Sequence, residues 1–233
     1  MNKVLFTLKS LLYQGNWNYQ NMHGSGFSYL FQYAVKSENL KLDEAEFKKS
    51  MDYFNTHPFF ITFIIGIMIK EYKKDLNPNY PKKIYGPAFA ALGDVFYWHS
   101  LRASLFVIAA LVGLSNPYLG VITYLLSFNI FHFLFLYNGY DIGLFYGRHT
   151  IDWFNRIKFA RWSVYMEYMA IFLLGLFVSL LCKKIFIINK INFIIFVLFL
   201  SIGLIAGKSL KISFSFCFGL IITGILFYFK GVF

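Results

Sequence analysis

Apolar side chains near the start of the chain recur at the spacing of one helix face. Within residues 3–13 they occupy positions i, i+1, i+4, i+7 and i+8: Val4, Leu5, Leu8, Leu11 and Leu12. This spacing predicts a helix with a single apolar stripe. Because the segment is too short to span a membrane, we expect it to lie in the membrane interface or to dock on the rest of the protein.

A second amphipathic helix is predicted over residues 43–54. Asp43 and Glu46 are placed to form a capping box, and apolar side chains follow at i, i+4 and i+7, namely Phe47, Met51 and Phe54. The polar residues 55–57 and Pro58 then end this helix and begin another, because Pro is tolerated in the first turn of a helix.

Two contrasting segments come next. Residues 59–69 are uniformly apolar, but a helix needs about 20 such residues to cross a hydrocarbon layer of ~30 Å. We therefore interpret this run as a re-entrant arm or as half of a broken helix. Residues 70–83 carry five Lys and two Pro, which predicts the main soluble loop, on the cytoplasmic side.

Longer apolar runs occupy the rest of the chain. Residues 103–140 contain no charged side chain and are divided by Asn116 and Pro117, which predicts two hydrophobic arms joined by a tight turn. Three further spans are expected, over residues 164–182, 191–207 and 212–229. Both loops between them carry lysines, so the positive-inside rule assigns these spans no orientation.

The composition decides the class of protein. Apolar residues make up 58% of the chain and charged residues 14%, against roughly 45–50% and about 25% in soluble domains. These values exclude a water-soluble globule and also intrinsic disorder. We predict an all-α integral membrane protein with amphipathic N-terminal helices, re-entrant or broken helices in the middle and several transmembrane helices toward the C-terminus. One membrane domain is divided into residues 1–58, 59–147 and 148–233.

The net charge of +11 does not indicate nucleic-acid binding. The basic residues punctuate apolar runs instead of forming a surface, which is typical of the lysine-rich and arginine-rich cytoplasmic loops of membrane proteins. Cys182 and Cys217 lie within apolar segments, at a spacing that suggests neither a metal site nor a redox pair. We therefore expect no metal and no cofactor.

Ionisable residues occur inside one apolar segment, residues 86–102. It contains Asp94, His99 and Arg102, and each such group costs at least ~2.5–3.5 kcal/mol at membrane depth. Asp94 and Trp98 share a helix face at i, i+4, and Arg102 is expected to pair with Asp94 and keep it ionised. The alternatives are a purely structural ion pair or an anchor at the end of a helix.

Five short motifs resemble those of a known family. They are QGNWNY at residues 14–19, FNTHP at 54–58, the segment 86–102 with Gly86–Pro87, Gly93–Asp94, Trp98 and Leu101–Arg102, then Phe128–Asn129, and Tyr140 with Gly143. In this order and spacing they are similar to the IID component of the mannose/fructose/sorbose-type sugar phosphotransferase system. The resemblance covers residues 10–147.

This resemblance implies a multi-pass subunit of the bacterial inner membrane. It implies a IIC partner that completes the sugar-translocating unit in an oligomeric complex, and cytoplasmic IIA and IIB proteins that relay phosphate from phosphoenolpyruvate. The incoming hexose would be phosphorylated on arrival. The family's IID component carries no phosphohistidine, so the five histidines are not expected to carry phosphate.

The chain also departs from the family pattern. Residues 70–74 replace an acidic stretch, His132 replaces an arginine, and the family's segment before the last spans is missing, with the short linker 183–190 in its place. A non-transporting scaffold or receptor that keeps only the surface for IIC is therefore an alternative. An unrelated membrane enzyme is disfavoured, since no metal triad, nucleophile elbow or phosphate loop is present.

A hexose offers hydroxyl groups and apolar ring faces, so its site needs carboxylates or amides together with an aromatic ring. The residues predicted to contact it are Asp94, Trp98, Asn55, His57, Trp17 and Asn18. The residues predicted to support the fold or the partner interface are Arg102, Gly86, Pro87, Gly93 and Asn129. For Asn129, hydrogen bonding between helices is the favoured role.

Overall fold

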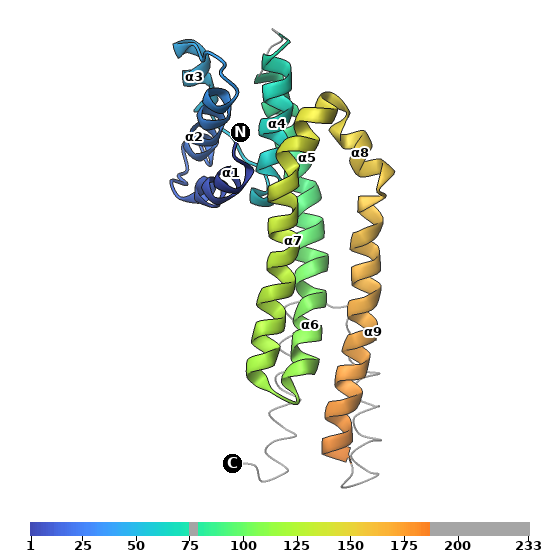
Figure 1. Cartoon of the computed structure of the whole chain (residues 1–233). Coiled ribbons are helices and arrows are strands. Elements are labelled where there is room, and N and C mark those ends of the chain that lie inside the picture. Colours follow the sequence, from blue (N-terminus) through green and yellow to red (C-terminus); the bar gives the residue numbers. More distant parts are fainter. Residues whose placement is uncertain (75–78, 187–233) are drawn as a thin grey trace. The chain divides into compact units, whose positions relative to one another are not determined.

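The computed structural model describes residues 1–74 and 79–186, so the spans expected at 191–207 and 212–229 lie outside the described residues (Figure 1). The described residues form helices, with two isolated bridge pairs and no strand. Residues 1–177 make one compact unit, and a second unit begins at Val178. The prediction of an all-α protein is confirmed for this part of the chain.

The first predicted helix is present, but its apolar stripe faces outward. Helix α1 spans Lys3–Ser10 and continues as the 3₁₀ turn η1, Leu11–Gln14. Asn2 caps it by accepting a hydrogen bond from the Leu5 N–H. The buried side chains of these two elements belong to Phe6, Thr7, Ser10 and Tyr13, whereas the predicted stripe stays exposed: Val4, Leu5, Leu8, Leu11 and Leu12.

Helix α2, Gly24–Ser37, was not predicted. Its buried apolar side chains do recur at helical spacing: Phe27, Leu30, Phe31, Ala34 and Val35. The sequence gives no signal for where this helix begins. The N-cap residue is His23, whose side chain makes no capping hydrogen bond, and the first turn holds two glycines and no acidic residue.

Helix α3, Glu44–Ser50, ends four residues before the predicted end at residue 54. Asp43 caps it by accepting a hydrogen bond from the Ala45 N–H (3.0 Å). Glu46 does not complete the capping box; its carboxylate instead accepts a hydrogen bond from the Tyr72 hydroxyl (2.7 Å). A tertiary partner therefore displaces the local one.

The short apolar run forms a fully enclosed helix. A 3₁₀ turn, η2 (Pro58–Phe60), leads into α4, Ile61–Tyr72, whose side chains from 61 to 69 are buried. At 12 residues α4 is about 18 Å long, which is too short to cross a bilayer. It packs mainly along α7, Pro117–Tyr146.

The soluble loop expected over residues 70–83 is shorter than predicted. Helix α4 runs on to Tyr72, and α5, Asn79–Gly93, begins before the stretch ends. Lys82 is only 5% exposed, and its ammonium donates hydrogen bonds to the carbonyls of Lys49 (3.2 Å), Ser50 (2.9 Å) and Asp52 (2.9 Å). This lysine therefore closes the end of α3 and does not lie in a solvated loop.

The middle of the chain is less broken than expected. Helix α5 passes directly into the π-helix η3, Asp94–Leu101, and then into α6, Arg102–Gly113. The predicted tight turn is confirmed, because Asn116 caps α7 by accepting hydrogen bonds from the N–H groups of Tyr118 and Leu119. Helices α6 and α7 then run side by side in opposite directions (Figure 1).

The basic connector, η4 (Gly147–His149) and α8 (Thr150–Arg156), leads to α9, Phe159–Phe186. Serines anchor α9 on the preceding helices: Ser100 donates a hydrogen bond to Glu167 (2.9 Å), and Ser104 donates one to the Met166 carbonyl (2.7 Å). Among the described residues, two helical stretches, 81–113 and 117–177, are long and apolar enough to cross a membrane.

Candidate functional site

The FNTHP motif lies between the N-terminal loop and helix α5. Met22 forms an isolated β-bridge with Phe54. The His23 N–H donates a hydrogen bond to the Phe54 carbonyl (2.9 Å), and the Phe54 N–H donates one to the Asn21 carbonyl (3.2 Å). The loop that begins with the QGNWNY motif is thereby held against residues 54–58. Two motifs about 35 residues apart in the sequence are neighbours in the fold.

Two glycines allow the same segment to contact helix α5. A Cβ atom on Gly86 would lie 2.9 Å from the ring of Phe54, and a Cβ on Gly93 would lie 2.2 Å from Cγ of His57. The two glycines are seven residues apart, or about two helical turns, so they lie on one face. Pro87 is within α5, directly after the first of these glycines.

His57 is at the centre of this contact and is 2% exposed. Its ring stacks on Tyr97 (centroids 4.9 Å apart, 10° between planes) and lies 5.5 Å from the ring of Trp98. Nδ1 accepts a hydrogen bond from the Phe59 N–H (3.4 Å), so we assign the proton of the neutral ring to Nε2. Within the described residues, Nε2 is buried without a hydrogen-bond partner.

Burial sets the protonation state of this ring. Desolvation, assisted by the nearby His132, lowers the pKa of His57 from 6.5 to about 3. The imidazole is therefore neutral at physiological pH and presents a buried N–H donor. His132 itself is stacked on Phe59, with 3.7 Å between ring centroids.

The predicted Asp94–Arg102 ion pair is not formed. Both side chains are exposed, and the guanidinium of Arg102 lies over the ring of Trp98, 5.5 Å from its centroid. Among the described residues, several aspartate and glutamate side chains form ion pairs with basic side chains, but Asp94 is not one of them. Spacing explains the difference: Asp94 and Arg102 are eight residues apart, or about 12 Å along an α-helix, whereas Trp98 and Arg102 are four apart and so are neighbours on one face.

Trp98 therefore has partners on several sides. Arg102 covers it from the next turn, Phe128 of α7 is nearly parallel to it (6.4 Å, 24°), and His57 approaches from residues 54–58. The indole remains 39% exposed. Asp94, His99 and Arg102 are exposed along the same helical segment, which makes this a polar and aromatic strip on an otherwise apolar helix.

The other predicted contact residues have separate roles. Asn18 holds its own loop, since its side chain accepts hydrogen bonds from the N–H groups of Gln20 and Asn21 (both 3.0 Å). Trp17 packs edge to face against Tyr19 (4.8 Å). Asn55 is hydrogen bonded to Nδ1 of His23 (3.1 Å). The structure thus places Trp17, Asn18 and Asn55 around the loop, and only His57 directly at Trp98.

Asn129 was predicted to bond between helices, and the structure shows a different arrangement. Its amide donates a hydrogen bond to the Leu125 carbonyl (2.8 Å), four residues earlier in the same helix. The sequence analysis also missed Tyr97, which is buried under His57 and donates a hydrogen bond to the Phe131 carbonyl (3.3 Å). Aromatic residues are so frequent in this chain that no sequence signal singled this one out.

A family model decides the assignment: the model for the mannose/fructose/sorbose family IID component of the phosphotransferase system matches residues 1–191. The chain belongs to the IID family. The motifs that meet around His57 and Trp98 all lie within the matched residues.

Curated relatives agree with this assignment. The mannose-specific EIID component of Escherichia coli (strain K12) is 25% identical over 148 residues, covering 58% of this chain and 52% of the relative. The sorbose-specific EIID component of Klebsiella pneumoniae is 24% identical over 187 residues, covering 76% and 68%. The first of these matches thus spans about half the length of the curated relative.

Solved structures share the fold. One, described as a membrane protein, has a TM-score of 0.69 at 18% identity, covering 98% of this chain and 96% of the other. A chain of the mannose transporter ManYZ in complex with microcin E492 has a TM-score of 0.55 at 19% identity, with the same coverage. At these identities the likeness shows a shared fold alone.

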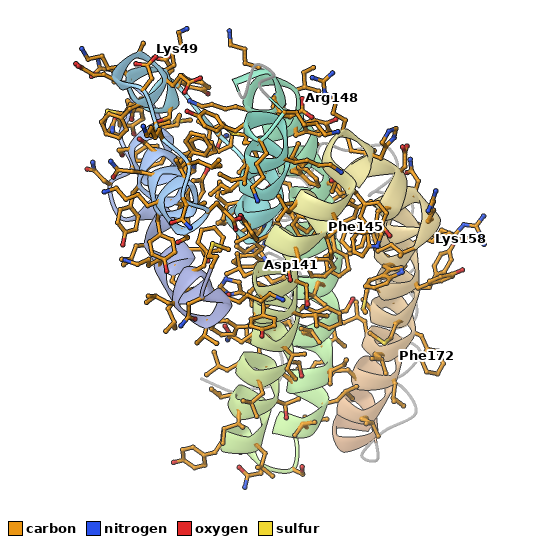
Figure 2. All side chains as sticks on the ribbon, turned by 45° about the horizontal axis from the view of Figure 1, so that its top comes forward. Lys49, Asp141, Phe145, Arg148, Lys158 and Phe172 are labelled. Carbon is orange, nitrogen blue, oxygen red and sulfur yellow. The ribbon has the colours of Figure 1, made fainter. Side chains whose placement is uncertain are left out.

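In this IID chain, residues 70–74 stand in place of the family's acidic stretch. Their side chains connect the C-terminal end of α4 to neighbouring segments. The Lys70 ammonium donates to the Phe145 carbonyl (2.5 Å), and Glu71 accepts two hydrogen bonds from Arg148 (2.9 and 2.6 Å). Figure 2 shows Arg148 beside the end of α4. Lys73 pairs with Glu38 (2.7 Å). The substituted residues therefore have structural partners.

Proposed function

We propose that this chain is the IID subunit of a phosphoenolpyruvate-dependent sugar phosphotransferase system. With a IIC-type subunit it forms, in the bacterial inner membrane, the unit that translocates a hexose of the mannose/fructose/sorbose class. Family membership supports this proposal, as do the mannose-specific and sorbose-specific relatives and the fold shared with a chain of the mannose transporter ManYZ.

The observation that carries the proposal is that three of the five family motifs meet at the polar and aromatic strip of η3: FNTHP through His57, the segment 86–102 itself, and Phe128 of α7. Such a strip is costly on a lipid-facing surface, so it faces a partner protein or a hydrated path. Asp94 offers a carboxylate for paired hydroxyl groups and Trp98 a partly exposed ring face for the sugar's C–H groups. We assign both to the route of the hexose.

Supporting roles follow from the contacts. His57 holds the indole of Trp98 from behind, and Arg102 covers it from the next turn. Gly86 and Gly93 allow residues 54–58 to approach α5 closely. Trp17, Asn18 and Asn55 act one step further away, by shaping the loop on which this segment rests.

The test is uptake of radiolabelled hexoses by cells that lack their own mannose-class transporters and express IIA, IIB and a IIC-type subunit, with or without this chain. We expect phosphoenolpyruvate-dependent accumulation of sugar phosphate only when the chain is present. A stable membrane complex without uptake would instead support the alternative, a scaffold that has kept only its assembly surface.

A further inference from the structure

An apolar groove runs between the N-terminal helix α1 and the long helix α7. Its volume is about 470 Å³, and its walls are formed chiefly by Val4 and Leu8 on one side and Ile130, Phe133, Leu134 and Tyr137 on the other. The α7 side chains recur at i, i+3, i+4 and i+7, so they form one continuous stripe. Their exposed fractions lie between 41% and 64%.

A pair of opposite charges closes one end of this groove. Lys3 forms an ion pair with Asp141, the next position along the same stripe of α7, and its ammonium lies 4.6 Å from the ring centroid of Tyr137. Figure 2 shows Asp141 on the side of α7 toward the N-terminal helices. The Lys3 side chain is 34% exposed and that of Asp141 53%, so both can accept a further partner.

The position of this pair along α7 matches a membrane boundary. No charged residue occurs from Pro117 to Tyr137, a helical stretch of about 30 Å, which is the thickness of the hydrocarbon layer. Tyr118, 81% exposed, and Tyr137, 41% exposed, mark its two ends, as aromatic side chains do at membrane interfaces. Lys3 and Asp141 thus lie at headgroup level and the groove at acyl-chain level.

We propose that the groove binds one acyl chain of a phospholipid with a zwitterionic headgroup, phosphatidylethanolamine. The lipid phosphate contacts the ammonium of Lys3, and the lipid ammonium donates hydrogen bonds to Asp141. Because Asp141 balances the charge of Lys3, the site gives no net attraction to an anionic lipid. A choline headgroup fits less well, because its quaternary ammonium has no N–H to donate.

The experiment uses the full chain in nanodiscs of equal parts phosphatidylethanolamine, phosphatidylglycerol and phosphatidylcholine. In each sample one lipid carries a photoreactive group near the end of an acyl chain, and mass spectrometry locates the labelled peptide. We expect the ethanolamine lipid to label residues 130–138 most strongly. Leu134→Trp fills the groove and should abolish this labelling, whereas Leu126→Trp, on an exposed part of α7 outside the groove, should preserve it.

Asp141→Asn tests the headgroup contact separately. Removing the carboxylate should lower labelling by the ethanolamine lipid about threefold and raise labelling by phosphatidylglycerol. Val4→Trp fills the groove from the α1 side and serves as a second variant if Leu134→Trp fails to elute as folded protein. Equal labelling by all three lipids, or labelling that survives both groove-filling variants, would overturn the proposal. So would loss of labelling when a IIC-type subunit is added, because the groove would then belong to a protein interface.

Discussion

The ring of His57 lies so close to the backbone of Gly93 that a Cβ atom there would be 2.2 Å from Cγ of the imidazole. This contact joins two motifs that are separated in the sequence, the FNTHP segment and the GD pair of the central helix. It also places His57 against Tyr97 and Trp98.

Gly93→Ala should therefore destabilise the protein, because the added methyl group must displace His57 from a buried site. Overpacking of this kind costs about 1–3 kcal/mol. The measurement is the midpoint of thermal unfolding in detergent. Gly175→Ala is the matched control, since a Cβ at that position meets nothing within 4 Å, and it should leave the midpoint unchanged or raise it slightly. Equal midpoints for the two variants would contradict the packing argument.

Stability should fall as the pH drops below about 6.5. The folded-state pKa of His57 is about 3 and the unfolded value 6.5, so the unfolded chain binds the proton more readily. Above pH 6.5 the neutral His57 ring contributes its full share to the free energy of unfolding. As the pH falls toward 3, this free energy decreases by up to about 1.4 kcal/mol per pH unit. Burial also lowers the pKa of His23, which acts in the same direction.

The His57→Gln variant checks this in unfolding midpoints measured from pH 7.5 to pH 4.5. The dependence on pH should be flatter than in the wild type, whereas Asn129→Gln, which changes no titratable group, should keep the wild-type slope. A slope that is the same in all three proteins would show that His57 does not carry the effect.

Lys82→Met should loosen the end of α3. The ammonium donates to three backbone carbonyls, and methionine keeps most of the apolar volume but leaves these acceptors unsatisfied. We expect faster amide hydrogen exchange over residues 50–54. Lys83→Met, at the exposed neighbouring position, is the control and should exchange like the wild type. Unchanged exchange in both variants would mean that the carbonyls are satisfied without Lys82.

Glu71→Gln should be destabilising, by about 1.5–3 kcal/mol, because it weakens the charge-assisted hydrogen bonds between a buried carboxylate and the half-exposed Arg148. The Glu71 side chain is 4% exposed and accepts two hydrogen bonds from Arg148. Glu44→Gln breaks an exposed pair with Lys48, for which the expected loss is at most about 0.5 kcal/mol. Thermal unfolding of the two variants in parallel tests this ranking, and a loss as small as that of Glu44→Gln would refute it.

Asp94→Asn should abolish hexose uptake while the complex with a IIC-type subunit is still recovered from the membrane. The substitution removes a charge that has no ion-pair partner among the described residues, so its effect on folding should be small. Asp152→Asn, which changes an exposed acid on α8, should retain uptake. If Asp94→Asn instead dismantles the complex, the carboxylate serves assembly and not the sugar.

The sequence alone was enough to predict where a helix begins when the signal comes from residues next to that helix end. Asn116 and Pro117 begin α7 as expected, and Asp43 caps α3, because an N-cap needs only a side chain and the next few N–H groups. The apolar spacing of residues 3–13 likewise predicted α1. The motifs identified the family without any knowledge of their positions in space.

The tertiary structure alone decided which groups meet. Arg102 was expected to pair with Asp94, but its guanidinium lies over the ring of Trp98. Lys82 was expected in solvent but is buried, because three carbonyls from a distant helix end surround it. Sequence spacing carries the geometry of one regular helix, whereas the contacts of Lys82 and His57 depend on partners far away in the chain, which only the packed structure supplies.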